Sequence, residues 1–190
     1  VGKGTQAKII KDKLRIAHIS TGELLRQEIA EKTEVGMVAK EYIDQGKLVP
    51  DNFLFTIVNE RLGKPDCRNG YILDGFPRTL NQANGLEKIM DPFNHSLDIA
   101  ISLYADEDAL VERLVKRGEN SGRSDDTSNI IRNRQKIYWQ QTAPLLDFYE
   151  ERGLLDNING LGEIKEITER ILTTIRSVSY THLTLPTKLA

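Results

Sequence analysis

The sequence predicts an α/β fold in which a parallel β-sheet is flanked by helices. Short apolar runs at residues 16–19, 70–74, 97–104 and 154–158 alternate with longer segments of helical periodicity. Parallel strands require crossover connections, so strands that are separated by helices favour a parallel sheet covered on both faces. A chain of 190 residues is long enough for one domain with a substantial core.

Apolar residues at helical spacing predict most of the helices. The first predicted helix directly follows Gly2 and Gly4. Ser20 and Glu23 have the spacing of a capping box at the start of the second helix. Pro144 predicts a kink in the long helix that follows a polar loop at 118–127. The predicted helices cover residues 6–13, 23–31, 35–45, 52–62, 106–116, 128–151 and 164–177.

Composition and charge are those of an ordinary globular domain. Hydrophobic residues make up 39% of the chain, charged residues 28%, and the formal net charge is −2, so no strong field draws the protein to nucleic acid or to an acidic membrane. No apolar run approaches the roughly 20 residues that span a bilayer, and we expect a cytoplasmic location. The single cysteine, Cys67, excludes an intramolecular disulfide.

Gly2, Lys3, Gly4 and Thr5 open the first helix with residues that suit phosphate binding. Glycines let backbone amides turn toward one point, a helix N-terminus attracts anions, and lysine adds a mobile positive charge. The hydroxyl of Thr5 is a candidate ligand for Mg²⁺. Taken alone, so short a segment favours a helix that simply begins at a glycine, and the phosphate-binding interpretation needs support from elsewhere in the chain.

Residues 74–78 give that support. Asp74 ends a buried apolar run, and a carboxylate opposite a phosphate loop is placed to hold the water shell of Mg²⁺. Pro77 fixes the turn, and Arg78 supplies a fork-shaped donor for phosphate. The alternative is a turn that ends a strand and carries a solvated arginine. With residues 2–5 also present, the functional interpretation is favoured.

Four arginines flank the polar loop at 118–127. Arg113 and Arg117 lie four residues apart and so share a helix face, Arg123 stands within the loop, and Arg134 lies on the next helix. Arginines on helices most often face solvent. Phosphoryl transfer between two nucleotides, however, gathers many negative charges, and stabilising them is nearly all the catalysis required. A flap that carries guanidinium groups and excludes water suits this reaction.

Together these groups resemble the adenylate kinase family in its short-lid form. The resemblance extends from residue 1 to about residue 176, and STG at 20–22, GFPR at 75–78 and SGRSDD at 121–126 make it specific. The matching segments are GKGTQA at 2–7, ISTGELLR at 19–26, GKLVP at 46–50, GYILDGFPRTLNQA at 70–83, KRGENSGRSDD at 116–126 and TAPLLDFYE at 142–150.

The resemblance implies a P-loop-type parallel sheet with a helical AMP-binding insertion at residues 20–49 and a short lid at 117–134. It implies an enzyme that reversibly transfers the terminal phosphate of ATP to AMP and gives two ADP, with Mg²⁺ as cofactor and ATP as co-substrate. It also suggests a monomer whose partners are ATP and AMP. Nothing in the sequence indicates a nucleic-acid or membrane partner.

The functional residues of the family carry over by position. The implied catalytic residues are Lys3, Arg78, Arg117, Arg123 and Arg134. The implied ATP-binding residues are Gly2, Lys3, Gly4, Thr5, Arg113, Arg117 and Gly162. The implied AMP site consists of Thr21, Arg26, Lys47, Leu48, Val49, Gly75, Phe76, Pro77, Arg78, Gln82, Arg123 and Arg134. Thr5 and Asp74 are implied for Mg²⁺.

Two residues bear on the choice of nucleotide. Thr21 and Gln82 match the adenylate members of the nucleoside monophosphate kinases. The amide of Gln82 offers a donor and an acceptor together, which suits the N6/N1 edge of adenine, so adenine is favoured over a pyrimidine. A UMP/CMP-type nucleoside monophosphate kinase is the first alternative, and a non-catalytic nucleotide-binding fragment is an alternative of another class.

The two ends of the chain carry further expectations. The family begins with an apolar central strand and a glycine-rich turn ahead of Gly2, and this first central strand is missing here. Burying four apolar side chains contributes roughly 6–12 kcal/mol, comparable with the roughly 5–15 kcal/mol by which a domain is stable, so we expect the chain as written to be unstable or inactive. We expect residues 1–177 to form the kinase core and residues 178–190 to be a non-native or disordered tail.

Overall fold

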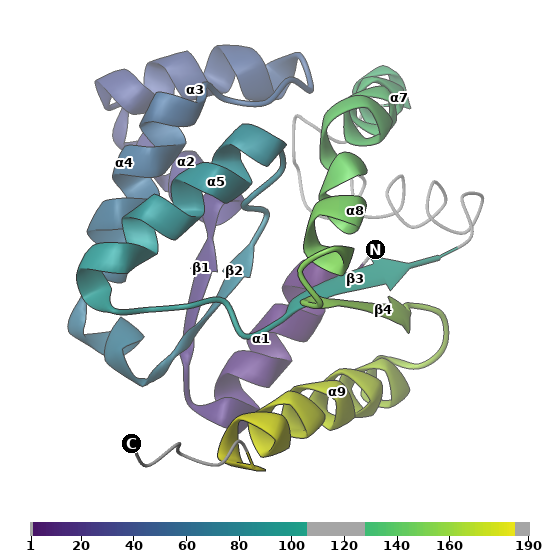
Figure 1. Cartoon of the computed structure of the whole chain (residues 1–190). Helices are drawn as coiled ribbons and strands as arrows, with labels where there is room; N and C mark the ends of the chain where they lie inside the picture. Colours follow the sequence, from purple (N-terminus) through teal and green to yellow (C-terminus); the bar gives the residue numbers. More distant parts are fainter. Residues whose placement is uncertain (1, 106–127, 185–190) are drawn as a thin grey trace.

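The computed structural model describes residues 2–105 and 128–184 (Figure 1). The strands are β1 (Ala17–Ser20), β2 (Tyr71–Asp74), β3 (Ala100–Tyr104) and β4 (Leu155–Asn159). The helices are α1 (Lys3–Leu14), α2 (Thr21–Glu31), α3 (Glu34–Asp44), α4 (Asp51–Leu62), α5 (Leu80–Met90), α7 (Ser128–Ile137), α8 (Pro144–Glu150) and α9 (Ile164–Thr184). Shorter helical turns are η1 (Pro65–Asn69), η2 (Asp91–Phe93) and the π-helical η3 (Tyr138–Thr142). The predicted helix at 106–116 and loop at 118–127 lie outside the described residues.

The described strands are parallel and form two pairs. β1 pairs with β2 so that Ser20 lies opposite Asp74, and β3 pairs with β4 so that Tyr104 lies opposite Asn159. In each pair the carboxyl ends of the strands meet at one edge, which is where parallel α/β proteins bind ligands. Helices α2 to α5 gather around the first pair, while α1 and α9 lie close to the second (Figure 1). The prediction of parallel strands flanked by helices is confirmed.

Helix α5 was not expected from the sequence. Its first turn is capped by Thr79, whose Oγ1 accepts a hydrogen bond from the amide of Gln82 at 3.1 Å. Ala83, Leu86 and Met90 are buried and share one helix face. This spacing is the signal in the sequence for the helix, but Asn84 and Gly85, which lie between these positions, lower the intrinsic helix propensity. Packing of the apolar face decides the conformation.

Two predicted helices have different bounds in the structure. The segment predicted as one helix over 128–151 is divided into α7, the π-helical η3 and α8. The hydrogen bonding changes before Pro144, which then occupies the first turn of α8, where no amide donor is needed. Helix α9 continues to Thr184, past the predicted end at Ser177. The expectation that helical structure is absent from residue 178 onward is therefore wrong for residues 178–184.

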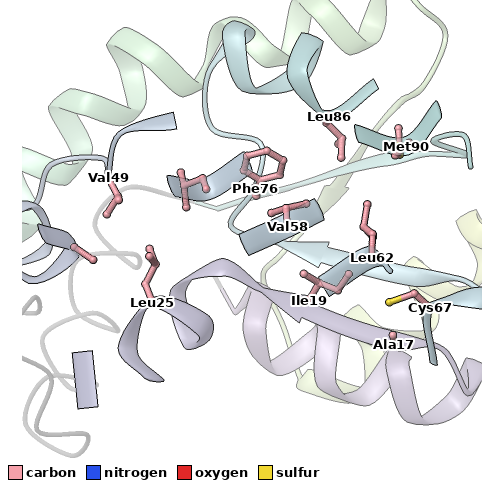
Figure 2. Packing of buried hydrophobic residues seen from close by; sticks show 12 residues of the cluster. Ala17, Ile19, Leu25, Val49, Val58, Leu62, Cys67, Phe76, Leu86 and Met90 are labelled. Atoms are coloured by element: carbon pink, nitrogen blue, oxygen red, sulfur yellow. The ribbon is translucent and has the colours of Figure 1, made fainter. Parts of the chain in front are cut away.

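The larger core lies between the β1–β2 pair and helices α2 to α5 (Figure 2). Strand β1 contributes Ala17 and Ile19, and Phe76 enters from the turn that follows β2. The ring of Phe76 meets that of Phe55 edge-on, with 6.2 Å between centroids. Since Phe76 is almost completely buried, the core fixes the turn that carries several candidate site residues. The other buried members are Leu25, Ala39, Val49, Leu54, Val58, Leu62, Cys67, Leu86 and Met90.

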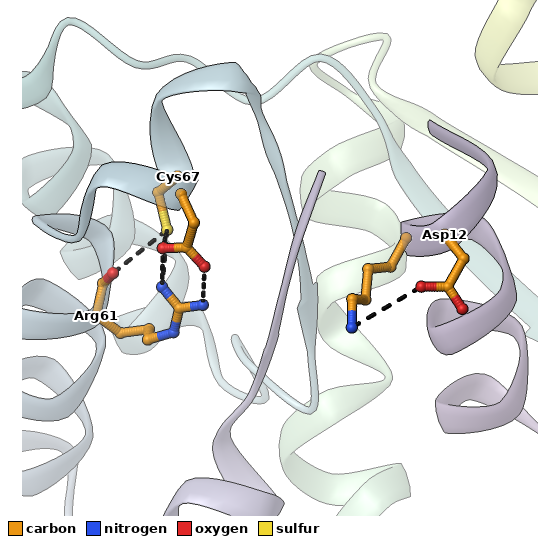
Figure 3. A network of polar contacts seen from close by, with 5 residues as sticks. Asp12, Arg61 and Cys67 are labelled. Carbon is orange, nitrogen blue, oxygen red and sulfur yellow. Dashed lines mark hydrogen bonds and ion pairs between the residues drawn. The ribbon is translucent and has the colours of Figure 1, made fainter. Parts of the chain in front are cut away.

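A salt bridge fastens η1 to the end of α4 beside this core (Figure 3). The guanidinium of Arg61 donates to both carboxylate oxygens of Asp66, at 2.8 and 2.6 Å. It also donates to Sγ of Cys67 at 3.1 Å. Cys67 is buried, and burial raises the pKa of its thiol. Its role in this part of the chain is therefore packing and hydrogen bonding rather than nucleophilic chemistry.

A second core joins α1 and α9 to the strands. Its members on α9 have the helical spacing of apolar residues that predicted this helix from the sequence. Its buried members are Ile10, Ile158, Ile167, Ile171 and Leu172. Ile72 of β2 and Leu103 of β3 pack against it, so this one core touches both strand pairs. Among the described residues, no helix has the length and apolar character needed to cross a membrane.

A buried polar contact locks the start of α1 to α9 within this region. The Oγ1 of Thr168 donates to Oε1 of Gln6 at 2.7 Å, and Nε2 of Gln6 donates to the carbonyl of Ile164 at 3.0 Å. Gln6 and Thr168 are 4% and 2% exposed. Because buried polar groups are costly to leave without partners, this pair fixes the position of the first turn of α1.

We predict that Thr168→Val lowers the free energy of unfolding by about 1–3 kcal/mol, because it leaves Oε1 of buried Gln6 without a donor. Chemical denaturation followed by circular dichroism measures the change. Thr173→Val, at an exposed position of the same helix, is the matched control and should change the stability by less than about 0.5 kcal/mol. Equal effects of the two substitutions would contradict the structural role of the Gln6–Thr168 contact.

Candidate functional site

The amino end of α1 presents Lys3. The helix begins directly after Gly2, which has a left-handed backbone with φ of 66°. Lys3 as a residue is exposed at this helix end, and the protein groups around its ammonium group affect its pKa. Burial lowers the pKa of Lys3, and the positive charge of Arg78 lowers it further. The negative charge of Asp74 raises this pKa, and the positive charge of Arg134 lowers it. These charges therefore lie within electrostatic reach of Lys3.

Asp74 ends β2 beside the start of α1. A Cβ placed on Gly4 would lie 3.4 Å from Oδ2 of Asp74, so the missing side chain leaves space between the carboxylate and the helix. Nε2 of His18 lies 3.4 Å from the same oxygen, and both side chains are largely buried. Thr5, in the first turn of α1, is exposed. The carboxylate and the amino end of α1 thus face a shared space.

The carbonyl of Gly75 organises the turn after β2. It accepts hydrogen bonds from Oγ1 of Thr21 at 3.1 Å and from Nε of Arg78 at 2.8 Å. Gly75 has φ of 82°, and a Cβ there would lie 3.1 Å from Nη2 of Arg78 and 3.2 Å from Oγ1 of Thr21. Glycine is required for the backbone and for the space. Buried Phe76 follows, joined to Pro77 by a cis peptide bond.

Gln82 lies behind this turn and has no exposed surface. Its Oε1 accepts a hydrogen bond from the amide of Arg78 at 2.8 Å, and its Nε2 donates to Oδ1 of Asp51 at 2.7 Å. Both ends of the side-chain amide are therefore engaged within the protein, where the sequence led us to expect contact with adenine. That contact stays a prediction and would use the second hydrogen of Nε2. The observed role of Gln82 is to fix the backbone of Arg78.

A second contact holds Arg78 from another direction. Oγ1 of Thr142 donates to the carbonyl of Arg78 at 2.8 Å. Thr142 ends η3, and π-helical turns next to α-helices are frequent at functional sites. Arg134 lies on α7, which runs directly into η3. One continuous helical segment therefore carries Arg134 and supports Arg78.

The other predicted AMP-site residues fall on α2 and on the turn before α4. The guanidinium of Arg26 folds back along α2, and a Cβ on Gly22 would lie 3.4 Å from its Nη1. Val49 is buried in the larger core, whereas Lys47 is exposed and Leu48 is partly buried. Val49 thus anchors a turn whose neighbouring side chains reach solvent.

Gly162 lies between β4 and α9, with φ of 110°. Nη1 of Arg170 donates to two carbonyls of this turn, each at 2.9 Å. Gln6 of α1 donates a hydrogen bond to the carbonyl of Ile164 at the start of α9. The turn that contains Gly162 therefore lies near the amino end of α1. A role of Gly162 in holding ATP stays a prediction. Arg170, which the sequence did not indicate, supports the turn that contains Gly162.

Of the predicted residues that the structure describes, three are brought within electrostatic reach of Lys3. These are Asp74, Arg78 and Arg134. Three others lie outside the described residues, namely Arg113, Arg117 and Arg123.

Two supporting residues were missed in the sequence, Asp51 and Thr142. Asp51 follows Pro50 and was interpreted only as the start of a helix. Thr142 opens the matching segment at 142–150 but carries no signal of its own. Their contacts join positions that are 31 and 64 residues apart in the chain. Such contacts depend on the tertiary fold, so local patterns do not show them.

Positive charge gathered at the amino end of a helix, next to a carboxylate at the end of a parallel strand, is the chemistry that nucleotide phosphates require. The fold and this site together define a nucleotide-binding α/β protein. Comparison with known sequences gives the family. A family model described as adenylate kinase matches residues 1–154.

Individual relatives agree with the family model. An adenylate kinase of Leptospira biflexa is 48% identical over 174 residues, which cover 92% of this chain and 94% of the relative. One of Bifidobacterium longum is 47% identical over 173 residues, covering 91% and 93%. One of Methanothrix thermoacetophila is 42% identical over 196 residues, covering 90% and 91%. The chain belongs to the adenylate kinase family.

We predict that Gly75→Ala lowers kcat/KM with AMP by roughly 10²-fold, the effect expected when a charged donor is displaced from the reacting phosphates. The added Cβ would crowd Nη2 of Arg78 and Oγ1 of Thr21. Gly153→Ala is the control, because Gly153 has a similar φ of 65° but no atoms within 4 Å of an added Cβ. Backbone strain should lower the melting temperature of both variants, and only Gly75→Ala should lose activity. Equal activity of the two variants would contradict the prediction.

Proposed function

We propose that this protein reversibly transfers the terminal phosphate of ATP to AMP and gives two ADP. The observation that carries the proposal is the gathering of Lys3, Arg78 and Arg134 beside Asp74 at the amino end of α1. Membership of the adenylate kinase family supports the same reaction.

The site suits direct transfer between two nucleotides. The two phosphate chains repel each other, and fixed cations that face both of them offset this repulsion as charge redistributes in the transition state. Arg78 is held at its Nε, its amide and its carbonyl, so its guanidinium is oriented before substrate arrives. Lys3 stands on a helix end whose dipole also favours anions. Positioned charge, rather than a covalent intermediate, is the contribution of these residues.

We assign the two nucleotides to the two sides of this charge cluster. ATP would lie on the side formed by Gly2, Lys3, Gly4, Thr5 and Gly162. AMP would lie on the side formed by Thr21, Arg26, Lys47, Leu48, Val49, Gly75, Phe76, Pro77, Arg78 and Gln82. Arg117 and Arg123, in the lid at 117–134, would complete the phosphate contacts with help from Arg113 on the segment before the lid. The insertion at 20–49 would bind AMP.

We propose that Asp74 and Thr5 hold Mg²⁺ together with the substrate phosphates. Mg²⁺ prefers oxygen ligands and commonly binds through one or two carboxylates plus phosphate and water. Asp74 fits this role, because its carboxylate lies next to the space left by Gly4. Within residues 2–105 and 128–184, no group of three or more His, Cys, Asp or Glu side chains is arranged to hold a metal ion. When bound, the ion would neutralise phosphate charge.

The experiment that tests the function is a coupled assay of ADP formation with ATP and each of AMP, UMP and CMP. We expect kcat/KM for AMP to exceed the values for UMP and CMP by roughly 10²-fold or more, because a site built for one base leaves polar groups unpaired with another. Comparable values with UMP or CMP would favour the pyrimidine alternative. ATP binding in calorimetry without any turnover would favour a non-catalytic nucleotide-binding protein.

The lowered pKa of Lys3 predicts a pH dependence of ATP binding. Phosphate stabilises the charged ammonium, so the affinity for ATP is constant while Lys3 is protonated and falls as the pH rises through its pKa toward the ordinary value of 10.5. In Lys3→Arg the charge persists, so its affinity should lack this fall even if it is lower overall. Calorimetric titration between about pH 7 and 10 measures the difference. Parallel profiles for the two proteins would contradict the prediction.

The cellular location and the assembly state are inferred from the sequence and from its resemblance to the family. We propose a cytoplasmic monomer in which residues 1–177 form the kinase core.

A further inference from the structure

Helix α7 contacts the turn that follows α3. Nδ2 of Asn133, on α7, donates a hydrogen bond of 2.7 Å to the carbonyl of Gln45. The two residues are 88 positions apart in the chain, so this surface contact joins two separate parts of the protein.

A glycine permits the helix to come this close. Gly46 has φ of 66°, and a Cβ placed on it would lie 3.0 Å from Cγ2 of Ile130, 3.1 Å from the carbonyl oxygen of Ile130 and 3.3 Å from Cγ of Arg134. A side chain at position 46 would therefore push α7 away and strain the backbone. We call Gln45, Gly46, Ile130 and Asn133 together the latch.

The latch joins two sets of functional residues. On one side, the exposed Lys47 and the partly buried Leu48 follow Gly46 directly. The turn is firmly tied to α3, because the amides of Gly46 and Lys47 donate to the carbonyls of Ile43 and Tyr42, each at 2.9 Å. Local opening of these two hydrogen bonds, which amide exchange reports, should become more frequent when the turn is not held on α7.

On the other side, α7 carries Arg134, whose charge acts on Lys3. Helix α7 also runs into η3, where Thr142 supports Arg78. Docking of the turn on α7 thus brings the segment assigned to AMP against the element that carries and supports the phosphate-binding arginines.

We propose that Asn133 is a positioning residue for AMP, which acts by holding the Gln45–Gly46 turn on α7 and so keeps the AMP side of the site assembled next to Arg134. This inference rests on the proposed function for its role toward AMP, while the latch itself is a property of the protein without nucleotide. Undocking lowers the fraction of molecules that are competent to bind AMP, and the apparent affinity falls by the same factor.

The test uses Asn133→Leu, which keeps the number and branching of the side-chain heavy atoms and removes the donor. Asn129→Leu, at an exposed position one turn earlier on α7, is the matched control. The first measurement is amide hydrogen exchange in the full protein without nucleotide. Loss of one hydrogen bond should speed exchange at residues 43–47 by roughly 2- to 10-fold in Asn133→Leu and leave it unchanged in Asn129→Leu.

The second measurement is steady-state kinetics with both substrates. KM for AMP should rise in Asn133→Leu by the factor by which the docked fraction falls, which is at most the roughly 2- to 10-fold change in exchange, while kcat, KM for ATP and the melting temperature match those of Asn129→Leu. A purely structural role would instead lower the melting temperature or change both KM values together.

Gly46→Ala provides a second variant that breaks the same latch by a different route. It should speed exchange at residues 43–47 and raise KM for AMP, and adding Asn133→Leu should produce little further change, because both substitutions remove one contact. Fully additive effects would overturn the idea that the four residues act as one latch.

The outcomes separate the latch from the proposed function. Exchange at 43–47 that is the same in wild type and Asn133→Leu overturns the latch. Faster exchange with an unchanged KM for AMP overturns the positioning role. Faster exchange in a protein that does not convert AMP supports the latch and overturns the proposed reaction instead.

Discussion

Repulsion between like charges is the constraint on which the arrangement of this protein depends. Arg78 and Arg134 both act on Lys3 in the absence of any phosphate, and burial together with the charge of Arg78 lowers the pKa of Lys3. Among these groups, Asp74 supplies the opposing charge. Held together in this way, the cations are unfavourable in the empty protein and favourable when phosphates arrive. The remaining structure has to keep them in place.

The fold meets this requirement with backbone and side-chain contacts that do not involve the charges themselves. Arg78 is fixed by the carbonyl of Gly75, by Gln82 and by Thr142, which belong to three different elements. The start of α1, with Lys3, is fixed through Gln6 to α9 in a buried contact. Phe76 ties the Gly75 turn to the larger core. The backbone that carries Lys3 and the backbone that carries Arg78 are thus anchored in different packed regions.

Helix α7 and η3 also relate two parts of the proposed AMP side to each other. Helix α7 and the π-helical η3 lie between the turn at Gln45 and the backbone of Arg78, and they contact both. Hydrogen bonding of the π type differs from that of the helices on either side, and such turns are frequent at functional sites. Through these two contacts the segment connects the turn at Gln45, on the proposed AMP side, to the backbone of Arg78.

The sequence by itself determined the class of this protein. Apolar runs separated by helical periods predicted the parallel α/β fold. The segments at 2–5 and 74–78 predicted phosphate chemistry, because glycines and a lysine at a helix start favour it when the same chain also has a carboxylate at a strand end. Tertiary structure alone decided that α5 is a helix, that Gln82 turns both ends of its amide to protein partners and that Asn133 meets Gln45. The contacts of Gln82 and of Asn133 join different structural elements. Helix α5 depends on the burial of its apolar face. Local sequence records neither partners nor burial, so these features required the assembled fold.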